Sequence, residues 1–173
     1  MKAILLSIQP KWCELIASGR KTVEVRKTKP KLETPFKVYI YMTKGKWYKN
    51  NKKKWQHGSG KVIGEFVCDT FITDRTFGHD ALLKAAACMS DVEAAVYCTN
   101  NEMYGWHISE LVIYDKSLLL SDFKPPCDGF DKRCQVSCAK ITIDGKSRCT
   151  RRQFTRPPQS WCYVAELAKG GEE

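Results

Sequence analysis

The stretch Gly19-Arg20-Lys21-Thr22-Val23-Glu24-Val25-Arg26 is the part of the sequence that decides the fold. Two valines alternate with Thr22, Glu24 and Arg26, which is the two-residue period of a strand with unlike faces. One face is apolar, and the other carries a hydroxyl, a carboxylate and a guanidinium in a row. An ordinary solvated strand can show the same pattern. The flanking residues must therefore decide whether the polar face is a functional surface or an ordinary solvated one.

The residues before this stretch predict a strand followed by a helix. Ala3 to Ser7 is a short apolar strand, and Pro10 stands where a helix can begin, because its fixed φ suits the first turn. Gly19 follows Ser18 as a natural left-handed residue at the helix end. The polar strand is therefore expected to start directly at a helix end, on the rim of a sheet.

The rest of the chain alternates between strand and helix patterns. Ser90 and Glu93 have the spacing of a capping box, which predicts that a helix begins there. An alanine-rich and leucine-rich helix is expected just before it. The expected strands are 37–43, 62–74, 104–115 and 160–167, and the expected helices are 79–89 and 90 to about 100.

Length and composition predict one soluble domain. A chain of 173 residues that is 43% hydrophobic can build one real core, so we expect a single domain over residues 1–173. The apolar run at the N-terminus is too short for a signal peptide or a membrane span, which predicts a cytoplasmic protein without a membrane partner. Four cysteines in apolar segments are expected to be small core residues in a reducing compartment. They are Cys13, Cys68, Cys88 and Cys98.

The net charge of +10 is unevenly distributed. Residues 1–60 hold fifteen Lys and Arg against three Asp and Glu, whereas residues 61–123 hold four against ten. Residues 124–173 hold ten against six. A cationic surface of this kind favours a polyanion such as nucleic acid, through counterion release. A lysine-rich face that serves solubility is the alternative.

The segment 44–61 contains seven lysines and three aromatic residues. Aromatic rings among cations are typical of contacts to single-stranded nucleic acid, because each base offers a stacking face and each phosphate a charge. A solvated hairpin whose aromatic side chains fold back on the domain is an equal alternative. The candidate contacts are Lys44, Lys46, Trp47 and Trp55.

A cysteine-rich excursion over residues 124–156 precedes the last expected strand. Its cysteines lie in a polar, basic run where a core position cannot explain them, and four thiolates satisfy the tetrahedral geometry of a structural zinc ion. The spacing C-x6-C-x3-C-x10-C lacks the paired C-x2-C knuckles of typical zinc sites, so disulfides or free thiols stay open. The candidate ligands are Cys127, Cys134, Cys138 and Cys149.

Four motifs together resemble the ASCH domain, a branch of the PUA-like superfamily. They are Ser7-Ile8-x-Pro10, Gly19-x-Lys21-x-x-Glu24-x-Arg26, Val38-Tyr39-Ile40-Tyr41 and Gly60-Lys61-Val62-Ile63-Gly64. The resemblance covers Met1 to about Phe123 and resumes over Pro157 to Leu167, which leaves the cysteine-rich excursion as an addition. It implies an α+β fold, mainly β with helices: a small, partly open β-barrel flanked by helices. It also implies a cleft beside the signature strand that recognises RNA or a modified nucleoside.

One branch of this family hydrolyses N4-acetylcytidine with a lysine, a threonine nucleophile and a glutamate. Lys21 matches the lysine of that branch, but Glu24 stands where the threonine would be. A carboxylate can act as a general base toward water, whereas the covalent route through a hydroxyl is lost. If the protein is an enzyme, the resemblance implies Lys21 and Glu24 as its catalytic pair.

Three hypotheses follow. In the first, Lys21, Arg26 and the 44–61 segment hold phosphates, while Glu24 and an aromatic residue, Trp106 or Trp161, read one base. In the second, the protein is a nucleoside amidohydrolase or a ribonuclease that uses Lys21 and Glu24. In the third, it is a protein-interaction adaptor that works through the cysteine-rich excursion.

Overall fold

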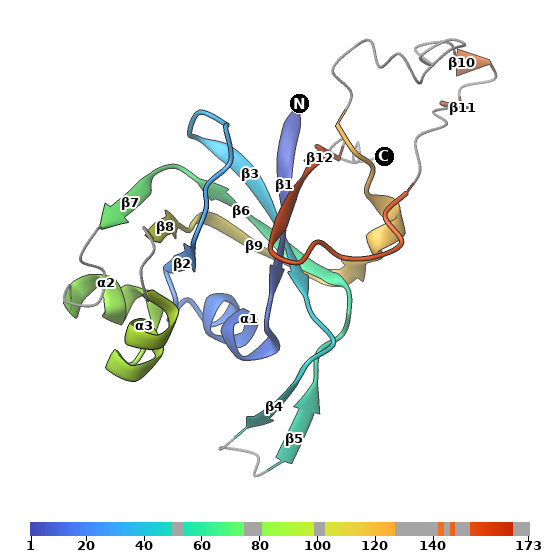
Figure 1. Cartoon of the computed structure of the whole chain (residues 1–173). Helices are drawn as coiled ribbons and strands as arrows, with labels where there is room; N and C mark the ends of the chain where they lie inside the picture. The colour runs from blue at the N-terminus through green and yellow to red at the C-terminus, as the bar shows by residue number, and fades with distance from the viewer. Residues whose placement is uncertain are drawn as a thin grey trace.

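The computed structural model describes residues 1–49, 54–74, 81–98, 103–126, 142–143, 146–147 and 153–167, which are mostly strands (Figure 1). The helices are α1 (Pro10–Ala17), α2 (Ala81–Ala87) and α3 (Asp91–Cys98), with a 3-10 turn at Leu120–Asp122. The strands are β1 (Lys2–Ile8), β2 (Val23–Arg26), β3 (Phe36–Met42), β4 (Lys46–Lys49), β5 (Lys54–His57), β6 (Val62–Cys68), β7 (Phe71–Asp74), β8 (Met103–His107), β9 (Ser109–Leu118), β10 (Thr142–Ile143), β11 (Lys146–Ser147) and β12 (Trp161–Ala165). The prediction of a mainly β fold with a few helices is confirmed.

Two sheets form the body of the protein. The larger has the order β12-β1-β3-β6-β9, in which β1 and β3 run parallel and the other neighbours are antiparallel. The smaller has the order β2-β8-β7 and is antiparallel throughout. The described strands therefore form separate sheets, and no closed barrel is present among them. The expected closing strand is confirmed, because β12 pairs with the N-terminal β1.

The central strand β1 is buried on both faces. Ile4, Leu6 and Ile8 point into one apolar cluster, which also holds Phe66 and Trp106. Ala3 and Leu5 point into a second cluster on the other face, together with Tyr39 and Phe123. A nearly continuous apolar run is what a strand needs when both faces of its sheet are covered.

The signature strand β2 separates an apolar face from a polar one, as its alternation predicts. Val23 and Val25 pack against Leu83, Ala87 and Met103 beneath α2. Successive side chains of a strand point to opposite faces, so Glu24 and Arg26 point away from this cluster. The chain enters β2 from the end of α1, where Gly19 has φ +72°. The N–H groups of Arg20 and Lys21 both donate to the Leu15 carbonyl, each at 3.0 Å.

The predicted starts of α1 and α3 are confirmed, and two expected strands are wrong in extent. The Glu93 carboxylate accepts from the Ser90 N–H at 3.0 Å, and the Ser90 hydroxyl accepts from the Glu93 N–H at 3.2 Å, which is the capping box. The strand expected over 62–74 is two strands, because β6 belongs to the larger sheet and β7 to the smaller one. The single strand expected over 104–115 is also two strands, β8 and β9. They separate at Ile108, because β8 pairs with β2 whereas β9 leaves to pair with β6.

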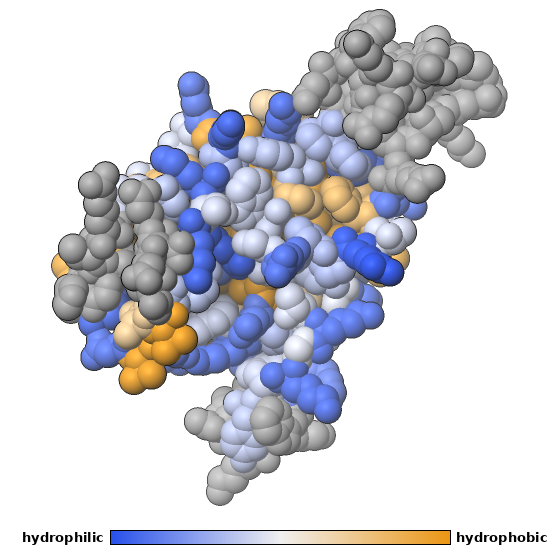
Figure 2. All heavy atoms as spheres, viewed as in Figure 1, coloured by the Kyte–Doolittle hydropathy of each residue, from blue (hydrophilic) through white to orange (hydrophobic). Residues whose placement is uncertain are grey.

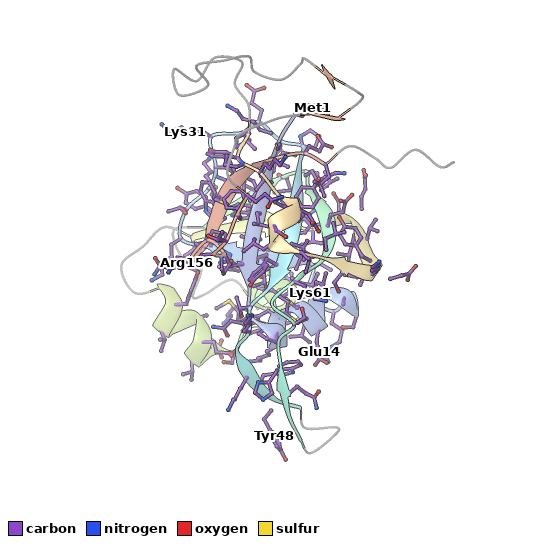
Figure 3. The ribbon with its side chains drawn as sticks, turned by 90° about the vertical axis from the view of Figure 1, so that its right-hand side faces the viewer. Met1, Glu14, Lys31, Tyr48, Lys61 and Arg156 are labelled. Carbon is purple, nitrogen blue, oxygen red and sulfur yellow. The ribbon has the colours of Figure 1, made fainter. Side chains whose placement is uncertain are left out.

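The lysine-rich segment forms a hairpin of β4 and β5 that projects from the body (Figure 1). Figure 3 shows Tyr48 toward its free end and Glu14 of α1 near its base. The indole N–H of Trp47 donates to the Glu14 carboxylate at 3.3 Å, so this aromatic side chain folds back on α1. The side chain of Trp55 lies outside the described residues.

Two of the expected core cysteines, Cys13 and Cys68, are buried with free thiols. Desolvation by burial raises the pKa of Cys68 to about 12, which keeps this thiol protonated near neutral pH. Cys88 is only partly buried, and the side chain of Cys98 lies outside the described residues. None of the helices in the described ranges has both the length and the apolar character needed to cross a bilayer.

Candidate ligand pocket at the signature strand

A pocket of about 570 Å³ opens beside β2, between α1 and α3. Three of its lining residues are the charged residues of the signature, and most of the others come from the two helices and from the ends of β1 and β3. The lining comprises Ser7, Gln9, Trp12, Lys21, Glu24, Val25, Arg26, Thr43, Met89, Val92, Glu93, Val96, Tyr97 and Gln159. The volume is in the range typical of small-molecule and cofactor sites. The structure thus brings Lys21, Glu24 and Arg26 together at one concave surface.

Glu24 lies between the two cations. Its carboxylate is 2.8 Å from the Arg26 guanidinium through Oε1 and 3.4 Å from Lys21 Nζ through Oε2. The three side chains are only 3%, 7% and 11% exposed for Lys21, Glu24 and Arg26. Two cations around one anion leave this buried cluster with a net positive charge, which favours an electron-rich partner.

Lys21 is held by the protein itself. Its ammonium group donates to the Ala87 carbonyl at the end of α2 at 2.7 Å, and it lies 4.9 Å from the centre of the Trp12 ring. Its ion pair with Glu24 is a third contact of the ammonium group. The side chain is also almost fully buried. It is therefore poorly placed for the phosphate contact expected of it, and it instead fixes the end of α2 against the signature strand.

Arg26 ties the signature strand to two distant segments. Its Nη2 donates to the Ser7 carbonyl at 2.7 Å, and its Nη1 is 3.4 Å from the Ser160 hydroxyl just before β12. Its Nε is buried and has no hydrogen-bond partner among the described residues. The guanidinium thus holds Glu24 in place and keeps one donor without a protein acceptor.

Trp12 is a pocket residue that the sequence interpretation missed. It lies two residues into α1, is partly buried, and lines the pocket opposite the apolar side chains of α3. The signal that could have found it is its position, because a side chain in the first turn of α1 lies near the end of β1, where the pocket opens. Its ring is also the contact surface of two lysines, Lys11 and Lys21.

The opposite wall of the pocket is apolar and exposed. Val92 and Val96 of α3 are each 73% exposed, and Figure 2 shows hydrophobic side chains gathered over this helix. Met89 and Tyr97 extend the same wall. The Tyr97 ring lies 5.1 Å from the ammonium group of Lys27, an exposed residue directly after β2. The pocket therefore combines a charged floor with aromatic and aliphatic walls.

An ion pair joins the two helices at the pocket. Lys11 Nζ of α1 lies 2.7 Å from Glu93 Oε1 of α3, and these side chains are 50% and 38% exposed. The hydrogen bond from Lys11, together with the capping bond from Ser90, lowers the pKa of Glu93 from 4.5 to about 2. The carboxylate is thus ionised throughout the neutral range.

This pKa shift predicts a pH-dependent contribution to stability. Because the pKa of Glu93 is lower in the folded state, its contribution is present above pH 4.5 and is lost as the pH falls toward about 2. Solvent screening of so exposed a pair limits the effect to less than about 1 kcal/mol. Urea denaturation should therefore show Glu93→Gln less stable than the unmodified protein at pH 7, with the difference shrinking toward pH 3. An unchanged difference at both pH values would contradict the pairing.

The other predicted site residues lie apart from this pocket. Trp106 is fully buried, with edge-to-face contacts to Phe36 and Phe71, so it offers no free face to a base. Trp161 donates its indole N–H to Thr28 at 3.0 Å and is not among the lining residues. The prediction that either residue reads a base in this pocket does not match their positions, because Trp106 is buried in the core and Trp161 lies partly buried against that core, outside the pocket lining.

The remaining candidates are divided between the hairpin and the cysteine-rich excursion. Lys44 and Lys46 are exposed near Thr43, a pocket-lining residue. The four candidate zinc ligands, Cys127, Cys134, Cys138 and Cys149, all lie outside the described residues. Within the part of the chain that the structure describes, no group of three or more His, Cys, Asp or Glu residues is arranged to hold a metal ion.

Comparison with known proteins identifies the family. A family model described as the ASCH domain matches residues 6–108, a range that begins within β1 and contains α1 and the entire signature strand. This chain belongs to the ASCH domain family. The family is generally thought to bind RNA, which agrees with the class of partner that the charge distribution favours.

Solved ASCH structures share this fold at low sequence identity. The ASCH protein from Zymomonas mobilis is 17% identical over 95% of this chain and 88% of its own, with a TM-score of 0.58. A variant of that protein gives 16% identity over 95% and 89%, with a TM-score of 0.57. No curated protein matches the sequence. At this level of identity the likeness shows the fold alone.

Proposed function

We propose that this ASCH protein binds single-stranded RNA and takes one base, or one modified nucleoside, into the pocket beside β2. The observation that carries the proposal is the buried Lys21–Glu24–Arg26 cluster at the floor of a pocket with aromatic and aliphatic walls. Pockets of this kind use apolar walls for contact area and a few polar groups for orientation.

The floor can hydrogen-bond to the edge of a base. Glu24 Oε1 accepts a hydrogen bond from Arg26, and Oε2 forms an ion pair with Lys21 at 3.4 Å. Each oxygen has capacity for a further bond, which suits an N–H or an exocyclic amine. The Arg26 guanidinium supplies donors for a neighbouring carbonyl or ring nitrogen. A ligand without matching groups would leave buried polar atoms unpaired, so the floor supports selectivity more than raw affinity.

The backbone of the RNA would be held by exposed lysines around the pocket. Lys21 and Arg26 are buried and engaged, so neither is assigned to phosphates any longer, and Arg26 with Glu24 is assigned to the base edge. Lys27, Lys44 and Lys46 are exposed, and each lies next to a strand end or a residue that lines the pocket. Substitutions in the pocket floor should therefore change base preference, whereas substitutions of the exposed lysines should change the salt dependence of binding.

Fluorescence anisotropy with short single-stranded RNAs tests the division. The triple variant Lys27→Ala, Lys44→Ala, Lys46→Ala should bind every sequence more weakly and should reduce the slope of log K against log salt by about 2, at about 0.7 per phosphate contact. Lys116→Ala, which removes an exposed lysine from β9, is the matched control and should leave the slope unchanged. Absence of RNA binding by the unmodified protein at about 50 mM salt would overturn the proposal.

The hydrolase alternative uses Lys21 and Glu24 as a catalytic pair, and the same protein samples can distinguish it from RNA binding alone. Lys21 already donates to the Ala87 carbonyl, and Glu24 forms ion pairs with both Lys21 and Arg26, so neither group is unengaged in the present arrangement. Mass spectrometry of RNA or N4-acetylcytidine after incubation should return unchanged material. Turnover that is lost in Glu24→Gln would make the protein an enzyme. The zinc and adaptor hypotheses rest on cysteines outside the described residues and stay predictions.

A further inference from the structure

Trp12 and Lys11 are neighbours on α1 that differ in how firmly their surroundings hold them. Two ammonium groups lie over the Trp12 ring, Lys11 at 4.3 Å and Lys21 at 4.9 Å from its centre. Lys21 is buried and bonded to the Ala87 carbonyl and to Glu24. Lys11 is half exposed, and among the described residues its one ion pair is with Glu93. Of the two cations, Lys11 is therefore the one that a ligand can displace.

We propose that Trp12 is the stacking platform for the bound base, and that Lys11 leaves the Trp12 ring and Glu93 to bind the phosphate of the same nucleotide. This inference rests on the proposed function and specifies its ligand. The pocket would take a nucleotide, with both a base and a phosphate, in preference to a free nucleoside. In the absence of the nucleotide, Lys11 lies over the Trp12 ring and pairs with Glu93, so the ring is covered until the nucleotide binds.

The exchange is favourable because each contact given up is weak. An exposed cation–π contact and an exposed ion pair are both small in water. A base stacked on an aromatic ring is worth more than the cation that it replaces. The displaced ammonium group exchanges a carboxylate for a phosphate, so its charge stays paired throughout.

The surroundings of Trp12 leave the base a second apolar surface. Val92 and Val96 of α3 are both 73% exposed and line the same pocket as Trp12. The Glu24 carboxylate lies on the floor of that pocket. A base on Trp12 would thus have an aromatic face, an aliphatic face and a polar edge within one site.

Variants of Trp12 test the platform. Trp12 also packs against the main core cluster, so Trp12→Leu is chosen to keep an apolar side chain while removing the aromatic face, and Trp12→Phe keeps a ring. Binding of a single-stranded RNA should weaken about 10-fold in Trp12→Leu and much less in Trp12→Phe, with the salt dependence unchanged in both. Trp161→Phe, a change outside the pocket lining, is the control. Equal affinity of Trp12→Leu and the unmodified protein would overturn the inference.

A double-mutant cycle tests the release of Lys11. Glu93→Gln keeps the capping box, because glutamine serves at that position as well as glutamate. It should raise RNA affinity several-fold when Lys11 is present and leave affinity unchanged in the Lys11→Met background. An equal gain in both backgrounds would mean that removal of a negative charge is the whole effect, which overturns the inference. If the unmodified protein binds no RNA, the proposed function and this inference both fail.

Discussion

Replacing Glu24 by glutamine is expected to lower the free energy of unfolding by about 3 kcal/mol, as measured by urea denaturation at neutral pH. The carboxylate is the counter-charge for both Lys21 and Arg26, at 3.4 and 2.8 Å. Glutamine has nearly the same shape but no charge, so two cations would stay buried without compensation. Removing one partner of a buried ion pair is strongly destabilising, because the other charge stays buried without compensation. Replacing the whole pair by apolar residues is often neutral, so the large expected effect comes from the uncompensated charges.

Two further variants separate this effect from a general change in the pocket. Glu93→Gln removes an exposed carboxylate from the same pocket and should cost less than about 1 kcal/mol at neutral pH. Adding Lys21→Met to Glu24→Gln should recover part of the stability, because one uncompensated cation is removed. A loss below about 1 kcal/mol for Glu24→Gln would mean that water compensates the cluster and that the pocket floor is not dry.

Trp106→Ala is expected to lower the free energy of unfolding by about 3–5 kcal/mol, because it removes the largest fully buried side chain among the described residues. The indole packs edge to face against Phe36 and Phe71, at centroid distances of 5.9 and 5.7 Å. A cavity would be left where β8 meets the main core cluster. Thermal or urea denaturation measures the loss directly.

Trp106→Phe is the matched control for this cavity. The indole N–H of Trp106 is buried and has no acceptor among the described residues, so phenylalanine gives up no hydrogen bond there and should cost much less than alanine. RNA affinity of Trp106→Phe should equal that of the unmodified protein. A selective loss of RNA binding with full stability would restore Trp106 as a base-reading residue and contradict its assignment to the core.

Local patterns in the sequence predicted the elements around the pocket well. Pro10 and Gly19 bound α1, and the alternation of Val23 and Val25 with charged residues separates the two faces of β2. The capping box at Ser90 was also readable, because it depends on residues three apart. Such signals act within a few residues, so they survive any arrangement of the rest of the chain.

Which aromatic residue would meet the base could not be read from the sequence. The alternation of its strand places Trp106 on one face with Ile108, but only the packing of Phe36 and Phe71 against the indole shows that this face is covered. Trp12 looked like an ordinary helix residue, yet the end of β1 places it beside β2 and α3. Exposure of a large side chain depends on which element covers it, and that element is distant in sequence.

The sequence by itself determined the charged triplet, the strand that presents it and the helix that precedes it, because these follow from side-chain periodicity and capping. Only the tertiary structure decided that Lys21 binds the Ala87 carbonyl, 66 residues away, and that Arg26 reaches Ser7 and Ser160. The physical reason is burial. A charge removed from water must find partners, and the packing of distant elements determines which partners are within reach.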